Sequence, residues 1–373
     1  MRITIVQGAF LPVPPVLGGG VEKIWFALGR EFASRGHTVT HISRTYEAFA
    51  QEEVLDGVRH VRLPGFDTPR SLVQLKWRDL RYSRRVLGVL PKADVLVTNT
   101  FWLPLLWPKP DAGKLYVHVA RYPKGQLRFY SRAIRLQTVS RAVRNAICAQ
   151  APRLAQRVKV IPNFVPRSVS TAVESSRRQQ SILYVGRIHP EKGIHLLVGA
   201  FAQLCAEGLR GWKLRIVGPW EVMKGGGGES YLNRLRDKSR EVRDLVEWPG
   251  PIFDVNALNA QYGQSSFFVY PSLAERGESF GLAPLEAMAA GCPPIVSSLE
   301  CFHDFIQAGK NGWIFDHRGA DPAKNLAEAL RTVIATADDL QLVRECAQCT
   351  AREFSLTKVA DQFLSDFREI VHK

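Results

Sequence analysis

Short apolar runs alternate with amphipathic stretches along the whole chain. In the first part, runs rich in β-branched residues are typical of buried parallel strands. They lie at residues 3–7, 38–43, 59–63, 95–99, 115–119, 137–140 and 158–161. Helical stretches such as 21–34, closed by Gly36, separate them. This alternation predicts an α/β domain with a doubly wound parallel sheet.

The pattern is interrupted at residues 166–180, which lack apolar periodicity and are rich in Ser and Arg, as in a surface linker. Further strand-like runs then follow at 182–185, 214–217, 246–248, 267–270, 295–297 and 313–315. We therefore predict two similar domains, residues 1–165 and 181–355, and a final helix within 356–373 that packs an apolar face on a core.

The length and composition agree with this division. A chain of 373 residues exceeds the size at which single cores stop growing, and 46% hydrophobic residues with 23% charged is ordinary globular material. No apolar run approaches a membrane span, and the amino end is too short for a signal peptide, so we expect a cytoplasmic protein. Six scattered cysteines suit a reducing compartment, and we interpret Cys346 and Cys349 as packing residues.

The net charge of +15 comes entirely from the amino-terminal half. Residues 1–170 contain 27 Lys+Arg against 10 Asp+Glu, and the remainder contains 23 against 25. Residues 70–92 hold seven of these cations and predict a basic amphipathic helix with Val73 and Trp77 on its apolar face. Residues 121–135 add cations between aromatic side chains. This balance indicates an anionic partner: a membrane surface, a phosphate-bearing substrate or nucleic acid.

The segment 270–291, YPSLAERGESFGLAPLEAMAAG, carries the clearest candidate chemistry. We expect a loop and a short helix, with Pro284 at the first helical position and Gly291 just past the end. Glu286 would then lie in the first turn, and Glu278 at the head of a glycine-containing loop. Backbone N–H groups in such a loop suit phosphate or sugar hydroxyls. The alternative is that one glutamate only complements the helix dipole and the other is solvated.

Two other strand-to-helix crossings have groups suited to a diphosphate. Arg187 and Lys192 follow the first strand of the second domain, where a guanidinium fork and a point charge can both bind phosphate oxygens. They are otherwise a pair of solvated surface cations. Gly19 and Gly20 follow the first strand of the chain, where glycines allow close approach of a phosphate or form a flexible turn.

Single residues near strand ends are further candidates. His118 ends the run 115–119, where it is either a structural histidine or a residue of the predicted cleft between the domains. Gly218 follows another run and would let a ring approach, and Phe253 either lines a base pocket or belongs to the core.

Together these residues resemble the retaining, nucleotide-sugar-dependent glycosyltransferases of family 4, which have the GT-B fold. The most specific feature is the paired-glutamate motif, Glu278 and Glu286 separated by seven residues, and the motif GRxxxxKG at residues 186–193 agrees with it. The resemblance covers the whole chain. It implies two Rossmann-like doubly wound domains that face each other across a cleft, with the carboxyl-terminal helix crossing back to the amino-terminal, acceptor-binding domain.

The resemblance also implies roles for the candidate residues. Glu278 would lie beside the donor sugar, and Glu286 would hold the ribose hydroxyls. Arg187 and Lys192 would neutralise the diphosphate, and His118 would contact the sugar near the reacting carbon. The other positions assigned to the donor are Gly19, Gly20, Gly186, Gly218, Phe253, Phe280, Gly281 and Leu282.

The implied reaction transfers a sugar with retention of its anomeric configuration. The nucleoside diphosphate leaves, the acceptor hydroxyl enters on the same face, and a phosphate oxygen of the leaving group takes the proton. No metal is expected, because no aspartate pair of the DxD type stands at a strand end, which agrees with a family that works without metal. No cofactor is expected either, and the donor, a UDP- or GDP-sugar, is a co-substrate. The acceptor would be a glycan, a lipid-linked or a small molecule in polysaccharide or glycolipid synthesis. The cations of residues 70–92 separately predict that the first domain docks on an anionic membrane.

Two other classes of function are open on the sequence. Sugar-nucleotide epimerases and phosphorylases use the same fold; an epimerase would convert the donor alone, and a phosphorylase would need free phosphate. A non-catalytic nucleic-acid-binding module would use the cations and aromatic residues at 121–135. The two-domain α/β pattern and the absence of nucleic-acid-binding motifs favour no nucleic-acid partner.

Overall fold

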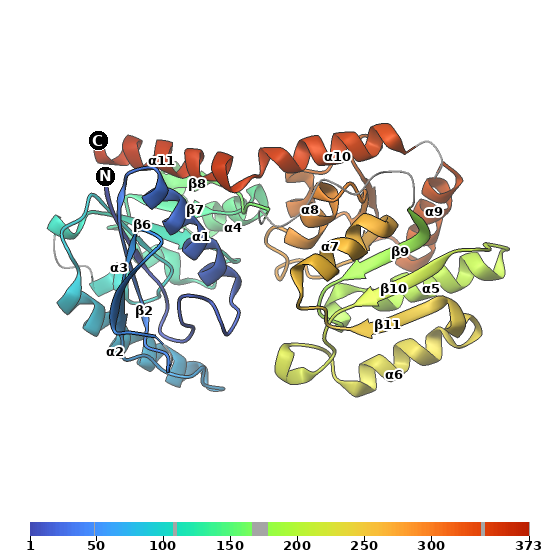
Figure 1. Cartoon of the computed structure of the whole chain (residues 1–373), viewed down its shortest axis with the longest axis horizontal. Coiled ribbons are helices and arrows are strands. Elements are labelled where there is room, and N and C mark those ends of the chain that lie inside the picture. Colours follow the sequence, from blue (N-terminus) through green and yellow to red (C-terminus); the bar gives the residue numbers. More distant parts are fainter. Residues whose placement is uncertain (48, 107–109, 166–177, 337–339, 373) are drawn as a thin grey trace. The chain divides into compact units, whose positions relative to one another are not determined.

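The computed structural model describes residues 1–47, 49–106, 110–165, 178–336 and 340–372. The chain divides into two compact units, which are described separately (Figure 1): Met1–Phe164 with Leu356–Lys373, and Val165–Ser355. Residues 166–177 of the predicted linker lie outside the described residues. Its last two residues, Gln179 and Gln180, already belong to the strand Gln179–Val185, because Gln179 pairs with Ser265 of a neighbouring parallel strand.

The first unit is built on an eight-stranded sheet in the order β3-β4-β2-β1-β5-β6-β7-β8. Its strands are β1 (Arg2–Val6), β2 (Thr38–Arg44), β3 (Glu52–Leu55), β4 (Val58–Leu63), β5 (Val95–Thr98), β6 (Lys114–Val119), β7 (Arg135–Thr138) and β8 (Val158–Val160). Among the described residues every strand pair in this sheet is parallel except β3 with β4, which form an antiparallel hairpin. The sequence did not predict β3, because this edge strand has no fully buried residue.

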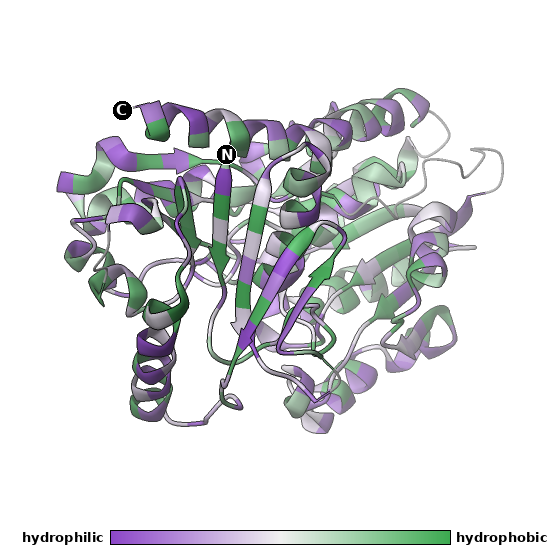
Figure 2. Cartoon of the chain, turned by 60° about the vertical axis from the view of Figure 1, so that its left-hand side comes forward, coloured by the Kyte–Doolittle hydropathy of each residue, from purple (hydrophilic) through white to green (hydrophobic). Residues whose placement is uncertain are grey.

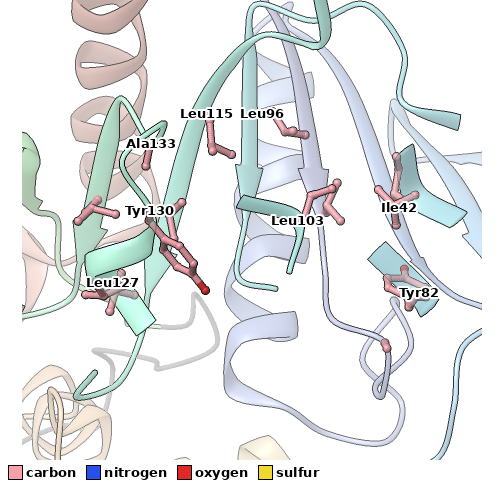
Figure 3. Close-up of a cluster of buried hydrophobic side chains, with 14 of the residues drawn as sticks. Ile42, Tyr82, Leu96, Leu103, Leu115, Leu127, Tyr130 and Ala133 are labelled. Atoms are coloured by element: carbon pink, nitrogen blue, oxygen red, sulfur yellow. The ribbon is translucent and has the colours of Figure 1, made fainter. Parts of the chain in front are cut away.

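Helices cover both faces of this sheet. On one face, α1 (Gly20–Ser34) and α11 (Leu356–His372) share a core with strand residues such as Ile3 and Ile5. On the other face lie α2 (Leu72–Val89), α3 (Leu103–Leu106), α4 (Arg141–Gln150) and the short 3-10 helix η2 (Gln126–Phe129). Figure 3 shows this second core, in which Tyr82 lies beside the strand residue Ile42 and Leu103 lies near the strand residue Leu96. The doubly wound arrangement predicted for this domain is confirmed.

The carboxyl-terminal helix α11 packs on the first unit although its sequence follows the second. Its apolar stripe, seen as alternating hydrophobic and hydrophilic bands in Figure 2, buries Phe363 and Phe367 against Phe32. Asp366 of the same helix lies 2.7 Å from the guanidinium of Arg135 and accepts a hydrogen bond from the hydroxyl of a buried tyrosine, Tyr116, at 2.9 Å. A buried ion pair thus accompanies the apolar contact.

The two sides of α2 have different environments. Val73 and Trp77 of the predicted apolar face are exposed, and the buried face contains Asp79, Tyr82 and Val86. The physical reason is the carboxylate of Asp79, which accepts hydrogen bonds at 3.1 Å from the backbone N–H groups of two residues that precede α3. Satisfying those buried donors turns the other side of the helix outward.

The second unit has a six-stranded parallel sheet in the order β11-β10-β9-β12-β13-β14. The strands are β9 (Gln179–Val185), β10 (Lys213–Val217), β11 (Val246–Gly250), β12 (Ser265–Tyr270), β13 (Pro294–Ser297) and β14 (Trp313–Phe315). The helices are α5 (Ile194–Ala206), α6 (Glu229–Lys238), α7 (Val255–Gln264), α8 (Leu282–Ala289), α9 (Pro322–Ala335) and α10 (Gln341–Glu353). Since β9 pairs with β12, the loops that follow these two strands leave the sheet side by side.

Two further features concern the described residues as a whole. None of their helices combines the length and the apolar character that a membrane span requires. The six cysteines form no disulfide. Cys349 is exposed on α10, so the interpretation of this cysteine as a packing residue was wrong; on a surface helix the position simply faces solvent.

Candidate active site

The loops after β9 and β12 pack directly against each other. The backbone N–H of Leu273 donates a hydrogen bond to the carbonyl oxygen of Glu191 at 2.8 Å. A Cβ atom at Gly193 would collide with the carbonyl oxygen of Pro271, so only glycine allows this approach. Two segments about eighty residues apart in sequence therefore form one structure at the carboxyl ends of adjacent strands, which is where open α/β sheets bind ligands.

Lys192 and Glu278, predicted from separate motifs, are in direct contact. The Nζ atom of Lys192 lies 2.7 Å from Oε2 of Glu278, and the two side chains are only 8% and 12% exposed. The hydroxyl of Tyr270 donates to the same carboxylate oxygen at 3.0 Å. The carboxylate is thereby held by two donors from neighbouring elements.

Two stacked tyrosines pack against the Lys192–Glu278 pair. The rings of Tyr184 and Tyr270 are nearly parallel with centroids 5.8 Å apart, and Lys192 Nζ lies 5.4 Å from the centroid of the Tyr270 ring. Burial, followed by the charge of Glu278, raises the pKa of both tyrosines well above the usual value. Each hydroxyl therefore keeps its proton at neutral pH and acts as a hydrogen-bond donor.

Arg187 is more exposed than Lys192 and has different partners. Its guanidinium donates to the carboxylate of Glu191 and to the carbonyl oxygen of Gly225, both at 2.8 Å. The second contact fixes the glycine-rich loop between β10 and α6. Both cations thus lie at the same strand end, as predicted, but each is paired with an acid.

The helix α8 begins earlier than predicted. Gly281, with a left-handed φ of 85°, is its N-cap, and a Cβ there would collide with the ring of Phe302. This turn starts the helix at Leu282, which makes Pro284 the third helical residue rather than the first. Glu286 consequently lies in the second turn, so its prediction as a first-turn residue was wrong. Gly291 follows the end of the helix as predicted.

Glu286 has a partner that the sequence did not reveal. The buried hydroxyl of Tyr262 in α7 donates to Oε2 of Glu286 at 3.2 Å. Burial, then the charge of Glu286, raises the pKa of Tyr262, so this donor also stays protonated. Between the two glutamates, Phe280 is buried against Phe305 and Phe354, while Leu282 is partly exposed.

The remaining candidates of the second unit have distinct environments. Gly218 is pressed against the carbonyl oxygen of Gly186, with which a Cβ would collide. The neighbouring backbone therefore requires glycine at this position, and its predicted role beside a ring stays a prediction. Phe253 is 79% exposed in the loop between β11 and α7, so it is not a core residue and its ring is accessible.

In the first unit, His118 has a defined tautomer. Its Nδ1 lies 2.5 Å from Oε1 of Gln137, whose amide nitrogen donates to the carbonyl oxygens of Thr138 and Ile161. The Gln137 oxygen must therefore accept, so Nδ1 carries the proton and Nε2 is a free acceptor. Among the described residues the buried Nε2 has no hydrogen-bond partner. Burial lowers the pKa of His118 to about 4 and keeps the ring neutral.

The glycine loop before α1 brings a buried acid to the same edge of the first sheet. Gly19 is the N-cap of α1, and its position leaves no room for a Cβ beside the carboxylate of Glu22. A Cβ at Gly20 would meet no neighbour. Burial raises the pKa of Glu22, and the charge of Arg121 opposes this shift. A glutamate in the first turn after three glycines was the available signal for this residue.

The described residues contain no cluster of three or more His, Cys, Asp or Glu side chains that would hold a metal ion. The charged groups that follow β9 and β12 include two cation–acid pairs, Arg187 with Glu191 and Lys192 with Glu278, while Glu286 in α8 accepts from the hydroxyl of Tyr262. This arrangement offers cations for a phosphate and carboxylates for hydroxyls once a ligand separates the pairs.

Comparisons with known proteins agree over the whole chain. Residues 170–348 match the family model described as glycosyl transferases group 1, and residues 18–169 match glycosyltransferase family 4. Spore coat protein SA of Bacillus subtilis is 26% identical over 99% of this chain and 100% of its own. The lipopolysaccharide 1,2-N-acetylglucosaminetransferase of Salmonella typhimurium is 28% identical over 56% of each protein. Anabaena HepE, solved with UDP and glucose, superposes with a TM-score of 0.70 at 18% identity over 99% of this chain and 100% of that chain.

The chain has two Rossmann-like units, and its last helix, α11, packs as part of the first of them. These features define the GT-B class, so the predicted fold is confirmed. Within that class, the chain belongs to the glycosyltransferases of family 4.

The buried neutral histidine leads to a prediction on acid stability. The folded-state pKa of about 4 for His118 lies below the ordinary value of 6.5, so the unfolded chain binds protons first as the pH falls. The stability that this difference contributes is complete above pH 6.5 and is lost toward pH 4, by about 3 kcal/mol in all. Urea unfolding between pH 7 and 4 should show a smaller loss for His118→Asn than for the wild type. Equal losses in the two proteins would contradict the assignment.

Proposed function

We propose that this protein transfers a sugar from a nucleoside-diphosphate sugar to an acceptor hydroxyl, with retention of configuration. The observation that carries the proposal is the contact of Lys192 with Glu278 beside Arg187, which joins phosphate-binding and hydroxyl-binding groups at one strand edge. HepE was solved with UDP and glucose, which supports a UDP-sugar as the donor; a GDP-sugar is the other candidate. The lipopolysaccharide relative supports an acceptor in cell-surface polysaccharide or glycolipid synthesis.

The donor would be bound by exchange of partners. Lys192 and Arg187 turn to the diphosphate, so the carboxylate of Glu278 becomes free to accept from sugar hydroxyls. Tyr270 keeps its hydrogen bond to Glu278 and holds that carboxylate in place. Glu286, oriented by Tyr262, accepts from the ribose hydroxyls. The backbone N–H groups of residues 280–282 are available to sugar hydroxyls and phosphate oxygens at the start of α8.

Residues of the first unit complete the proposed donor contacts. The unprotonated Nε2 of His118 accepts a hydrogen bond from a hydroxyl of the donor sugar. Gly19 and Gly20 let the backbone approach the diphosphate. During transfer the bond between the anomeric carbon and the diphosphate oxygen breaks, and a bond to the acceptor oxygen forms on the same face. The acceptor proton passes to an oxygen of the leaving diphosphate, so no separate base is needed.

We propose that the reaction needs neither a metal ion nor a cofactor. Arg187, Lys192 and the dipole of α8 supply the positive charge that the leaving diphosphate requires. Addition of excess EDTA should therefore change the initial rate of nucleoside diphosphate release by less than about twofold, which corresponds to a change of only about 0.4 kcal/mol in the activation free energy. Loss of activity in EDTA that Mg²⁺ or Mn²⁺ restores would contradict this part of the proposal.

The function itself is tested by following a panel of UDP- and GDP-sugars with and without a lipid extract as acceptor. The proposal predicts that one nucleotide sugar yields nucleoside diphosphate and a glycosylated product only when the acceptor is present. Conversion of the donor to an epimer without acceptor, or sugar 1-phosphate chemistry that depends on free phosphate, would identify the epimerase or phosphorylase alternative and contradict the proposal.

A further inference from the structure

We propose that the exposed face of α2, together with the loop that contains η2, is a docking surface for an anionic lipid membrane. This inference is separate from the donor site, since it rests on the surface of the first unit and not on Lys192 or Glu278. The surface is defined here by its apolar and basic side chains and is called the α2–η2 surface. Figure 1 shows α2 at the outer boundary of the first unit.

The apolar part of the α2–η2 surface is unusually exposed. Leu72, Val73 and Trp77 at the start of α2 are 76%, 79% and 54% exposed, and Phe129 at the end of η2 is 63% exposed. Val73 lies one turn before Trp77, so these two side chains are neighbours on the helix, and Leu72 adds an exposed apolar side chain at its first residue. Such a patch is costly in water and marks an interaction site when it is rimmed by polar residues.

Cations continue the same face of α2. Arg81 follows Trp77 by four residues, and its guanidinium lies 4.7 Å from the centroid of the Trp77 ring. Arg84 follows on the next turn and is exposed. Arg85 is different because it donates to the carbonyl oxygen of Pro64, so we leave it out of the docking group. The helix therefore presents apolar side chains at one end and arginines along its length.

The η2 loop is joined to this face through aromatic contacts. Lys76 Nζ lies 3.0 Å from the centroid of the Phe101 ring, and Phe101 contacts Tyr130, which directly follows η2. Two basic segments that are separated in sequence are thus packed against each other in the first unit.

The mixture of side chains favours a membrane over nucleic acid. Arginines bind the phosphate of either partner, so charge alone does not distinguish them. Leu72 and Val73 have no ring to stack on a base, whereas aliphatic and tryptophan side chains enter the boundary between headgroups and acyl chains. A face with Leu, Val and Trp at one end and arginines beside it is therefore complementary to an anionic bilayer.

The test is cosedimentation of the full chain with vesicles of phosphatidylcholine alone or with phosphatidylglycerol. We expect binding to the mixed vesicles, weakened by salt, and little binding to phosphatidylcholine alone. Arg81→Glu with Arg84→Glu should weaken binding to the mixed vesicles by at least about tenfold. Val73→Asp with Trp77→Asp should weaken it while leaving the number of cations unchanged.

Arg153→Glu with Lys159→Glu is the matched control, because it makes the same charge change in exposed residues of η3 (Pro152–Arg157) and edge strand β8. It should retain most of the binding. Nucleotide-sugar binding, measured on the same samples, reports that each variant is folded. The proposal would be overturned if the double variant Arg81→Glu, Arg84→Glu bound vesicles as well as the wild type does. It would also be overturned if the protein bound an RNA oligonucleotide more tightly than vesicles and the double variant Val73→Asp, Trp77→Asp bound that RNA as well as the wild type does. If the wild type bound its donor but not the vesicles, the docking proposal would be contradicted and the proposed function would be unaffected.

Discussion

Replacement of Glu278 by Gln should lower the turnover of the donor by about 10²- to 10³-fold, the range found when one preorganised charge-stabilising group is lost. The substitution keeps the shape of the side chain but removes the charge that faces Lys192 at 2.7 Å. A neutral amide accepts sugar hydroxyls less strongly and leaves the cation without its partner. Steady-state release of nucleoside diphosphate measures the effect, and circular dichroism checks the fold.

Glu275→Gln is the matched control for this experiment. Glu275 lies in the same loop but is 51% exposed and pairs with Arg318 and His317 rather than with Lys192. Its replacement should change turnover by less than about twofold, because exposed ion pairs contribute little. If Glu278→Gln behaved like Glu275→Gln, Glu278 would be a structural partner of Lys192 and nothing more.

Replacement of Asp366 by Asn should lower the free energy of unfolding by about 3 kcal/mol or more, as expected for one partner of a buried ion pair. The side chain of Asp366 is fully buried, and that of Arg135 is 9% exposed, so the guanidinium would keep its charge without a buried counterion. Tyr116 would also lose an ionised acceptor. The consequence is loosening of α11 from the first unit.

Glu369→Gln provides the comparison for Asp366. Glu369 also contacts Arg135, at 3.0 Å, but its side chain is 42% exposed. Its replacement should cost less than about 1 kcal/mol. Urea denaturation of both variants measures the difference, and equal effects would show that the buried position of Asp366 has no special importance for α11.

Much of the fold was predictable because buried parallel strands carry a strong local signal. Runs such as β6 and β12 are apolar on both faces, and their boundaries were close to those observed. The edge strand β3 has no such signal, since its residues are half exposed. Which side of α2 is buried was not predictable, because the hydrogen bonds of Asp79 to backbone groups before α3 arise only in the tertiary structure.

The chemistry of the candidate site was predictable residue by residue, but its contacts were not. Glu278 and Lys192 were both expected near strand ends, yet their contact depends on the pairing of β9 with β12, which follows two other strands in sequence. Tyr262 and Gln137 were missed because a buried tyrosine or glutamine has no local motif. Each orients a candidate group only through tertiary structure.

The most direct test of the account is calorimetric titration of the wild type and Glu286→Gln with UDP, GDP and their sugar conjugates. Tyr262 orients Glu286, whereas the Lys192–Glu278 pair is formed by other residues, so replacement of Glu286 should leave that pair intact. We predict that one nucleotide and its sugar conjugates bind the wild type, and that Glu286→Gln weakens all of them by about tenfold or more, since hydrogen bonds to a charged group contribute about 1.5–3 kcal/mol. Binding of no member of the panel to the wild type, or equal binding to both proteins, would contradict the account.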